Sequence, residues 1–318
     1  MSINKADRKW LKDNFGPQVL FNESMSRHTT FGIGGPADVL LLAKTDRQIK
    51  DVTRWANERG HSLITLGAGS NLLVRDGGIQ GIVLKLANGF TSIDQDTEES
   101  PNGSAVVRAG AGVLLRQLAQ YALDRGLAGL NFGLGIPGTV GGALRMNAGA
   151  WGACIADTTK SISVLTQMGD IVTMGKEELR FSYRRLDLQE GNIILRGEFQ
   201  LKRTDRETLR KDAVRMQKKR RSTQPLSLRS AGSIFLNPSS GMSAGELIDR
   251  AGLKGLRKGG AEVSTEHANF IVNKGHATAS EVLALIGLVR QRVFERFGVS
   301  LELEVMIVGQ EADSQQLL

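Results

Sequence analysis

The stretch GLGIPGTVGGALRMNAGAWG, residues 133–152, holds seven glycines, one proline and one asparagine, and its composition governs the choice of fold. A solvated linker would be poor in apolar residues, whereas this stretch interleaves Leu134, Ile136, Val140 and Trp151 with its glycines. Glycine lets the backbone approach another surface closely and adopt a positive φ. The stretch therefore predicts a tight turn, a close packing contact or a bound ligand.

The whole chain has the composition of a globular protein. It has 318 residues, of which 41% are hydrophobic and 23% charged, which is enough for two or three domains with cores of their own. No apolar run approaches the roughly 18 residues of a membrane span, and the start MSINKADRKWLKDNFG lacks the apolar core of a signal peptide. We expect a cytoplasmic protein without membrane insertion.

The residues that commonly ligate metals are few and scattered. The single cysteine, Cys154, excludes an internal disulfide framework and a cysteine-based metal cluster. The four histidines, His28, His61, His267 and His276, show no HxxxH spacing. We therefore expect no metal site.

The formal net charge is +8, and RMQKKRRS, residues 215–222, is the densest basic run. Such a run indicates a solvated helix face, a site for an anionic small molecule, or a nucleic-acid surface. No nucleic-acid-binding motif is recognisable, and only 5% of the residues are aromatic and able to stack on bases. We expect phosphorylated small ligands and no nucleic acid.

Local patterns predict several elements. Apolar residues recur at helical spacing after Thr45 and the pattern closes on Gly60, which predicts a helix over 46–59. A second helix is predicted to end at Gly126, and a polar turn is expected between strands within 91–112. A β-hairpin is expected around Gly169–Asp170, followed by a strand over 192–204.

The pattern changes to a charged helix from Asp205 onward, so we place a domain boundary there. Two further helices begin with pairs that match the S/T-x-x-E capping box, Ser243 with Glu246 and Thr278 with Glu281.

The segment LGAGSNLLV, residues 66–74, begins like a dinucleotide-binding fingerprint but departs from it. That fingerprint needs a third glycine at position 72 and a helix behind it, and here Leu72 opens a β-rich run. The turn still offers successive backbone N–H groups after a strand, with the side chains of Ser70 and Asn71 beside them. It is a candidate nest for a pyrophosphate.

Four signatures in this order resemble the UDP-N-acetylenolpyruvoylglucosamine reductase family of peptidoglycan synthesis. They are TTFGIGGPAD (29–38), LGAGSNLLV (66–74), GIPGTVGGALRMNAGAWG (135–152) and SAGSIFLNP (230–238). AGLKG (251–255), GGAEVSTEHANFIVN (259–273) and LELEVMIVG (301–309) extend the resemblance over nearly all of the chain. The chain is most similar to the shorter form of the family, which lacks an extra substrate-covering tyrosine loop.

The resemblance implies an α+β fold: the FAD-binding vanillyl-alcohol-oxidase (PCMH) type, with two α+β subdomains and a C-terminal α+β substrate domain. On this basis we expect FAD-binding subdomains at 1–92 and 93–204, a substrate-binding domain at 205–300, and a C-terminal strand and tail at 301–318 that return to the active site. The oligomeric state is not determined by sequence, and a monomer is the expectation.

The implied activity is NADPH-dependent reduction of UDP-N-acetylglucosamine enolpyruvate to UDP-N-acetylmuramate through non-covalent FAD. Hydride passes to the enolpyruvyl methylene carbon, and negative charge develops beside the carboxylate. By the family's motifs, Ser233 donates the proton, Arg184 faces the carboxylate, and Glu304 polarises that region. Taken singly, these residues are more often a turn hydroxyl, a surface arginine and a solvent-facing glutamate in an alternating strand.

The resemblance also implies two sets of ligand-binding residues. Those expected at the cofactor are Gly67, Ala68, Gly69, Ser70, Asn71, Leu72, Ile136, Pro137, Gly138, Thr139, Gly142, Asn147, Ala148 and Gly149. Those expected at the substrate are Tyr183, Lys218, Lys219, Arg229, Asn237, Glu262, His267 and Asn269.

Two positions depart from the family pattern. Leu236 and Met306 stand where the family commonly carries a cation. We expect Lys218, Lys219 or Arg229 to compensate for these losses.

Two other functions compete with this interpretation. One is an FAD oxidoreductase of the same fold that acts on an alcohol or hydroxy acid and tethers its flavin covalently. The other is a basic nucleic-acid or sugar-nucleotide binding protein without catalysis, which would be colourless when purified.

Overall fold

The computed structural model describes residues 3–96, 103–239 and 241–312. The chain forms two compact units, each assembled from three segments. The first unit comprises Met1–Leu20, Leu40–Ala68 and Gly81–Arg220, and the second comprises Phe21–Val39, Gly69–Gln80 and Arg221–Leu318. The expected turn within 91–112 is only partly described, because residues 97–102 lie outside the described residues, as do residues 313–318 of the expected C-terminal tail.

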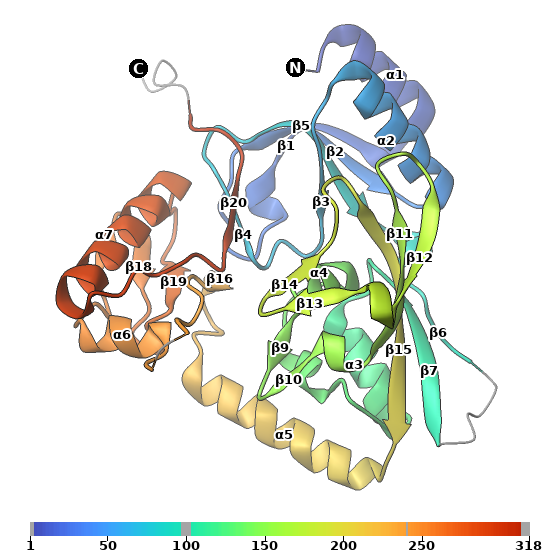
Figure 1. The fold of residues 1–318 in the computed structure, drawn as a ribbon. Coiled ribbons are helices and arrows are strands. Elements are labelled where there is room, and N and C mark those ends of the chain that lie inside the picture. Colours follow the sequence, from blue (N-terminus) through green and yellow to red (C-terminus); the bar gives the residue numbers. More distant parts are fainter. Residues whose placement is uncertain (1–2, 97–102, 240, 313–318) are drawn as a thin grey trace. The chain divides into compact units, whose positions relative to one another are not determined.

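A four-stranded sheet in the order β1-β2-β5-β3 carries the N-terminal part of the chain; its strands are β1 (Val19–Ser24), β2 (Pro36–Ala43), β5 (Ile79–Leu86) and β3 (Leu63–Leu66). Helices α1 (Lys5–Phe15) and α2 (Asp46–Arg59) lie side by side, at the top of Figure 1, with Trp10 stacked on Trp55 at 4.6 Å between ring centroids. The predicted helix over 46–59 is confirmed. Thr45 caps it by accepting from the N–H of Gln48, and Gly60 ends it in a left-handed conformation.

The largest segment of the first unit carries an antiparallel sheet in the order β12-β11-β15-β7-β6, with β8 also paired to β15. Its strands are β12 (Ile171–Gly175), β11 (Thr159–Leu165), β15 (Ile193–Arg203), β7 (Ser104–Gly110), β6 (Ile93–Gln95) and β8 (Leu127–Ala128). Helices α3 (Leu115–Asp124) and α4 (Val140–Arg145) contribute Leu118 and Leu144 to its core. The hairpin around Gly169–Asp170 and the strand before Asp205 are both confirmed.

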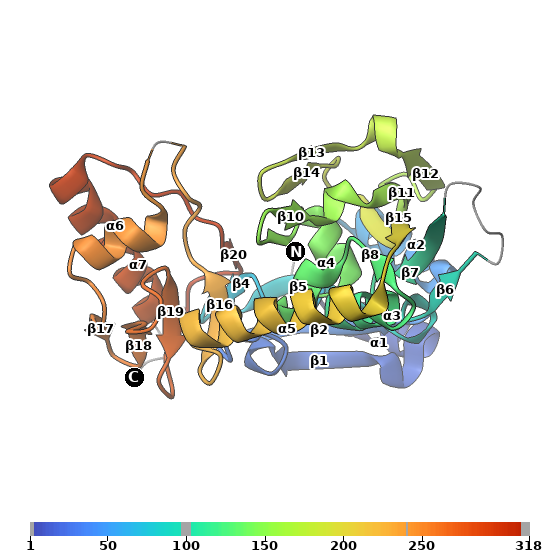
Figure 2. The ribbon, with the colours of Figure 1, turned by 90° about the horizontal axis from the view of Figure 1, so that it is seen from below.

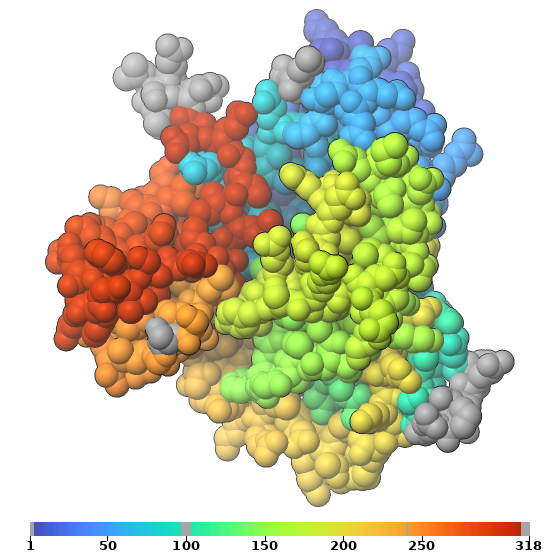
Figure 3. Space-filling model, in the orientation of Figure 1, coloured from blue at the N-terminus to red at the C-terminus, as the bar shows by residue number. Residues whose placement is uncertain are grey.

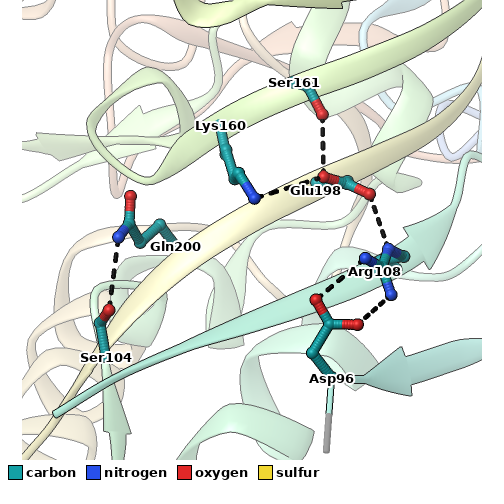
Figure 4. A network of polar contacts seen from close by, with 7 residues as sticks. All are labelled: Asp96, Ser104, Arg108, Lys160, Ser161, Glu198 and Gln200. Atoms are coloured by element: carbon teal, nitrogen blue, oxygen red, sulfur yellow. Dashed lines mark hydrogen bonds and ion pairs between the residues drawn. The ribbon is translucent and has the colours of Figure 1, made fainter. Parts of the chain in front are cut away.

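A network of charged side chains crosses this sheet (Figure 4). Arg108 on β7 donates through Nε to Glu198 on β15 at 2.6 Å, and its other nitrogens bind Asp96. Ser161 and Lys160 on β11 reach the same Glu198 carboxylate, at 3.1 and 4.0 Å. Burial opposes ionisation of Glu198, but the hydrogen bonds from Arg108 and Ser161 outweigh it, so the pKa of Glu198 is lowered.

Two small hairpins complete the first unit, β9 (Gly149–Ala150) with β10 (Ala153–Cys154) and β13 (Arg180–Ser182) with β14 (Arg185–Asp187). Short 3-10 turns stand at η1 (Gly16–Gln18), η3 (Asn88–Phe90), η4 (Asn131–Gly135), η5 (Ile155–Asp157) and η6 (Lys176–Glu178), and η2 (Met25–Arg27) belongs to the second unit. The charged helix predicted from Asp205 is α5 (Arg206–Thr223), the gold helix in Figure 2.

The second unit pairs β16 (Arg229–Ser233), β19 (Phe270–Asn273), β18 (Ala261–Val263) and β17 (Arg257–Lys258) in that order. Helices α6 (Ala244–Arg250) and α7 (Ala279–Phe297) pack Leu247 and Val289 into its core. The capping box at Thr278 is confirmed, with Thr278 and Glu281 each accepting from the other's N–H. At α6 only the Ser243 half is formed, because the Glu246 carboxylate pairs with Arg250 at 2.8 Å.

A parallel pair of short strands, β4 (Leu72–Val74) and β20 (Met306–Val308), joins the middle segment of the second unit to its C-terminal segment. Within the C-terminal segment the strand begins only at Met306, and Leu303 forms an isolated antiparallel bridge with Phe235. Residues 302–305 instead bond to the backbone that follows β16, since Leu236 N–H donates to Glu302 O and Glu304 N–H donates to Ile234 O, both at 2.9 Å.

Candidate active site

The backbone hydrogen bonds of the second unit bring three of the sequence signatures to one place. Thr30 donates its N–H to Gly69 O at 3.1 Å and its hydroxyl to Ser230 O at 2.7 Å. The Asn71 side chain donates to Glu304 O at 2.9 Å. Glu304 in turn reaches Ile234, the residue after Ser233. The turn at 69–71, the end of β16 and the segment before β20 are therefore held together.

Ser233 owes its placement to a bulge in β16. Ser230 pairs with Val272 and Ser233 with Phe270, so three steps along β16 match two along β19. Gly232, with a φ of 76°, supplies the left-handed residue in this bulge. Because side chains alternate along a strand, the extra residue changes the face to which Ser233 points.

Arg184 lies in the first unit, in the two-residue turn Tyr183–Arg184 between β13 and β14. Its φ is 57°, which is uncommon for a side chain of this size, and such backbone strain concentrates at functional sites. The neighbouring Arg185 is exposed and pairs with Asp187 at 3.5 Å. This strand pair belongs to the yellow-green surface in Figure 3, and the Tyr183 residue is 55% exposed.

Asn147 anchors the hairpin that carries Arg184. It is buried, has a φ of 41°, and donates its side-chain amide to Ser182 O at 2.9 Å. Its side-chain oxygen accepts from the N–H of Ala156 at 3.3 Å. Both side-chain polar atoms of this residue, which we expected at the cofactor, are thus used within the protein.

The glycines of residues 133–152 serve different ends. A Cβ on Gly133 would lie 3.0 Å from Leu115, one on Gly141 would lie 2.9 Å from Ala111, and one on Gly149 would lie 2.8 Å from Cys154. These three glycines are therefore explained by packing within the protein. Gly142 is exposed, and a Cβ there would meet only Thr139 Oγ1, at an ordinary 3.6 Å. At Gly142 the glycine leaves an open backbone surface on which a flat ligand can lie.

The turn at 67–71 carries donors that suit a diphosphate. Among the described residues, no protein acceptor is found for the backbone N–H groups of Ala68, Gly69 and Ser70. By contrast, the N–H groups of Val140 and Gly141 at the start of α4 donate to Val113 O and Ala111 O. A Cβ on Gly67 would lie 2.6 Å from Thr139 Oγ1, so this turn begins against the start of α4. The open N–H groups of this turn and the bare backbone at Gly142 are therefore features that fit a cofactor with a diphosphate and a flat ring, such as FAD.

Several residues expected at the substrate are engaged by the protein itself. The Asn269 side chain bonds through both polar atoms to the backbone of Phe235, at 2.9 and 2.8 Å. Glu262 is buried and paired with Arg257, and Asn237 accepts from the N–H of Ala244 at the start of α6. His267 accepts from the N–H of Asn269, and burial, helped by the charge of Lys254, lowers the pKa of its imidazole.

The expected substrate cations differ in their surroundings. Lys218 is exposed, and the Lys219 ammonium lies 4.9 Å from the centroid of the Trp151 ring. Arg229 runs along Gly32, where a Cβ would lie 2.7 Å from its Cδ. Met306, which stands where the family commonly carries a cation, is half exposed. Arg220 belongs to the basic run 215–222, in which the sequence did not single it out, and it has the helical spacing of the buried face of α5.

Two family models match the chain. The model for the C-terminal domain of UDP-N-acetylenolpyruvoylglucosamine reductase matches residues 224–308, and the model for the FAD binding domain matches residues 37–175. Among the part of the chain that the structure describes, no helix is long and apolar enough to cross a membrane.

Relatives match over almost their full length. The chain is similar to the UDP-N-acetylenolpyruvoylglucosamine reductase of Desulfosudis oleivorans, with 43% identity over 97% of this chain and 100% of the relative. It is 41% identical to the enzyme of that name from Syntrophus aciditrophicus, over 96% of each chain. The crystal structure of UDP-N-acetylenolpyruvylglucosamine reductase from Thermus caldophilus superposes with a TM-score of 0.77 at 38% identity, covering 92% of this chain and 98% of that one.

Proposed function

The chain belongs to the UDP-N-acetylenolpyruvoylglucosamine reductase family, and from that premise we propose that Ser233, Arg184 and Glu304 are its catalytic residues. It is an FAD-containing, NADPH-dependent oxidoreductase of peptidoglycan precursor synthesis, with the α+β fold of the vanillyl-alcohol-oxidase type. Its reaction converts UDP-N-acetylglucosamine enolpyruvate to UDP-N-acetylmuramate. When bound, the flavin supplies the hydride that the enolpyruvyl methylene carbon receives.

The residue roles follow from the charge that this reaction creates. Addition of hydride to the methylene carbon places negative charge on the carbon beside the carboxylate, and that carbon must receive a proton. Ser233 donates its hydroxyl proton there and regains one from solvent. The planar guanidinium of Arg184 binds the substrate carboxylate, and Glu304 polarises the same region.

One observation carries this proposal, the joining of Asn71, Glu304 and the end of β16 by hydrogen bonds in the second unit. It supports a site in which a phosphate-binding turn stands beside a proton donor and a carboxylate. The strained backbone of Arg184 gives separate support to its role.

The finer parts of the assignment belong to the same proposal. The cofactor is held by residues 67–72 and 136–149, and the substrate by Tyr183, Lys218, Lys219 and Arg229 together with residues of 205–300. The functional divisions fall near residues 92, 204 and 300. We also propose a cytoplasmic monomer that binds no nucleic acid. Sedimentation of the purified protein with and without duplex DNA tests the oligomeric state and the absence of DNA binding.

Stopped-flow measurement of the two half-reactions tests the role of Ser233. Ser233→Ala should leave flavin reduction by NADPH near the wild-type rate, because that step needs no proton from this residue. It should slow reoxidation by the enolpyruvyl substrate by about 10²–10⁴-fold, while Ser233→Cys retains more activity because a thiol still donates.

Ser230→Ala on the same strand is the matched control, because only the backbone of Ser230 takes part in the hydrogen bonds described above. Equal slowing of both half-reactions in Ser233→Ala would make Ser233 a structural residue. Unchanged rates would remove it from the mechanism.

A further inference from the structure

Helix α5 attaches to the first unit along one narrow face. Leu209 and Ala213 are its buried residues, and they pack against Leu123 and Leu134. The side chain of Asn131 donates to Leu209 O at 3.2 Å, which fixes the helix beside η4. Because residues at spacings of three and four share a helix face, this face continues through 216 and 217 to Arg220.

Arg220 therefore carries a charge on the face of α5 that turns toward the protein. A Cβ on Gly135 would lie 2.8 Å from its Cδ and 3.0 Å from its Nη1, so the bare backbone of Gly135 makes room for the guanidinium. Burial lowers the pKa of Arg220, although the group remains charged at neutral pH.

Arg220 has no counter-charge among the described residues. Its Nε is buried without a hydrogen-bond acceptor, and no ion pair or hydrogen bond of its guanidinium is found across residues 3–96, 103–239 and 241–312. Its neighbours differ, since Lys218 and Arg221 are exposed and Lys219 lies over Trp151. A partly desolvated cation without a partner lowers the stability of the folded protein, and an apolar residue would pack at this position equally well.

We propose that Arg220 is an anion-binding residue whose ligand is a diphosphate. A guanidinium presents planar paired donors that match phosphate oxygens, and Gly135 directly precedes the segment 136–149 assigned to the cofactor. The inference rests on the proposed function for its ligands, because FAD and the UDP-sugar each carry a diphosphate. It adds a residue that the family signatures quoted above do not contain.

The test separates binding from folding by comparing Arg220→Met, Arg220→Lys and Arg210→Met. Arg210 is an exposed arginine of the same helix and serves as the matched control. Urea unfolding is measured on each apoprotein with and without inorganic pyrophosphate. The FAD dissociation constant of the apoprotein and the UDP dissociation constant of the holoprotein are measured by titration.

Arg220→Met should leave the apoprotein as stable as the wild type or more stable, because a cation without a counter-charge is removed. It should abolish stabilisation by pyrophosphate and raise one dissociation constant by about 10- to 100-fold, with Arg220→Lys in between and Arg210→Met unchanged. An increase for FAD identifies the cofactor diphosphate, and an increase for UDP identifies that of the substrate.

Two results would overturn the inference. One is unchanged affinity for pyrophosphate, FAD and UDP in Arg220→Met. The other is loss of apoprotein stability in both Arg220 variants, which marks a packing role. If wild-type protein bound pyrophosphate through Arg220 but neither bound FAD nor reduced the enolpyruvyl substrate, the proposed function would fail while the anion site stood.

Discussion

Replacing Asn147 by alanine should both destabilise the first unit and loosen the turn that carries Arg184. The change removes the hydrogen bonds to Ser182 O and from Ala156 N–H, each worth about 1 kcal/mol. Holding an alanine at the φ of 41° costs roughly 1–2 kcal/mol more. The free energy of unfolding should therefore fall by about 3–4 kcal/mol.

Asn147→Gly separates the contribution of the hydrogen bonds from that of the backbone conformation, because glycine adopts the positive φ without strain but has no side chain. It should lose only about 2 kcal/mol, the share of the two hydrogen bonds. Urea unfolding followed by circular dichroism measures both losses, and hydrogen exchange of the amides of β13 and β14 locates them. Equal losses in the two variants would refute the role of the backbone conformation. A loss below about 0.5 kcal/mol in Asn147→Gly would refute the role of the hydrogen bonds.

The same variants bear on catalysis. Because Ser182 precedes the Tyr183–Arg184 turn, loss of its anchor should slow the substrate half-reaction by about 10- to 100-fold. In a double-mutant cycle with Arg184→Ala, the Asn147→Gly effect should largely disappear, since the turn then has no arginine to position. Additive effects would show that Asn147 acts on the reaction by another route.

Three further predictions concern cofactor, charge and substrate. Acid precipitation should leave FAD in the supernatant, because little Cys154 thiolate is available for a covalent tether. Burial raises the pKa of the Cys154 thiol, and the hydrogen bond that the thiol donates to Asp157 raises it further. Flavin in the pellet would contradict this prediction. Glu198→Gln should cost below about 1 kcal/mol at neutral pH, since the network is near the surface. The pKa of Glu198 is lower in the folded protein than in the unfolded chain, where it is near 4.3. The contribution of Glu198 to the free energy of unfolding is therefore complete above the pKa of the unfolded chain and is lost as the pH falls through the pKa of the folded protein. The urea midpoints of variant and wild type should converge in acid. Alanine at Lys218, Lys219 and Arg229, singly and together, should raise the substrate KM. Each of these cations that contacts phosphate should contribute roughly 1.5–3 kcal/mol to the free energy of substrate binding. An unchanged KM across the set would show that these residues do not compensate for Leu236 and Met306.

Elements that depend on neighbours in sequence were predictable. The helix at 46–59 and the box at Thr278 follow from caps within one turn, and the hairpin at Gly169–Asp170 follows from its turn residues. Each rests on hydrogen bonds between residues a few positions apart, which a sequence pattern encodes directly.

Features that depend on distant residues were not predictable in the same way. The Glu302–Glu304 run alternates like a strand, yet its N–H and C=O groups bond to Ile234, Leu236 and Asn71. The bulge at Gly232 requires knowledge of the register against β19, and the placement of Arg220 requires knowledge of which face of α5 is covered. Catalytic roles came from family motifs, because a lone serine, arginine or glutamate has no periodicity that marks it.

The pairing of β4 with β20 has a consequence for how the protein is made. These strands lie roughly 230 residues apart in sequence, so a ribosome adding about 5–20 residues per second leaves β4 without its partner for roughly 10–50 s. During that interval the Asn71 amide also lacks its acceptor, Glu304 O. The turn at 67–71 therefore gains the last of its hydrogen bonds only when translation is nearly finished. A message truncated before codon 308 would yield a protein whose first unit has all its segments but whose second unit lacks its closing strand.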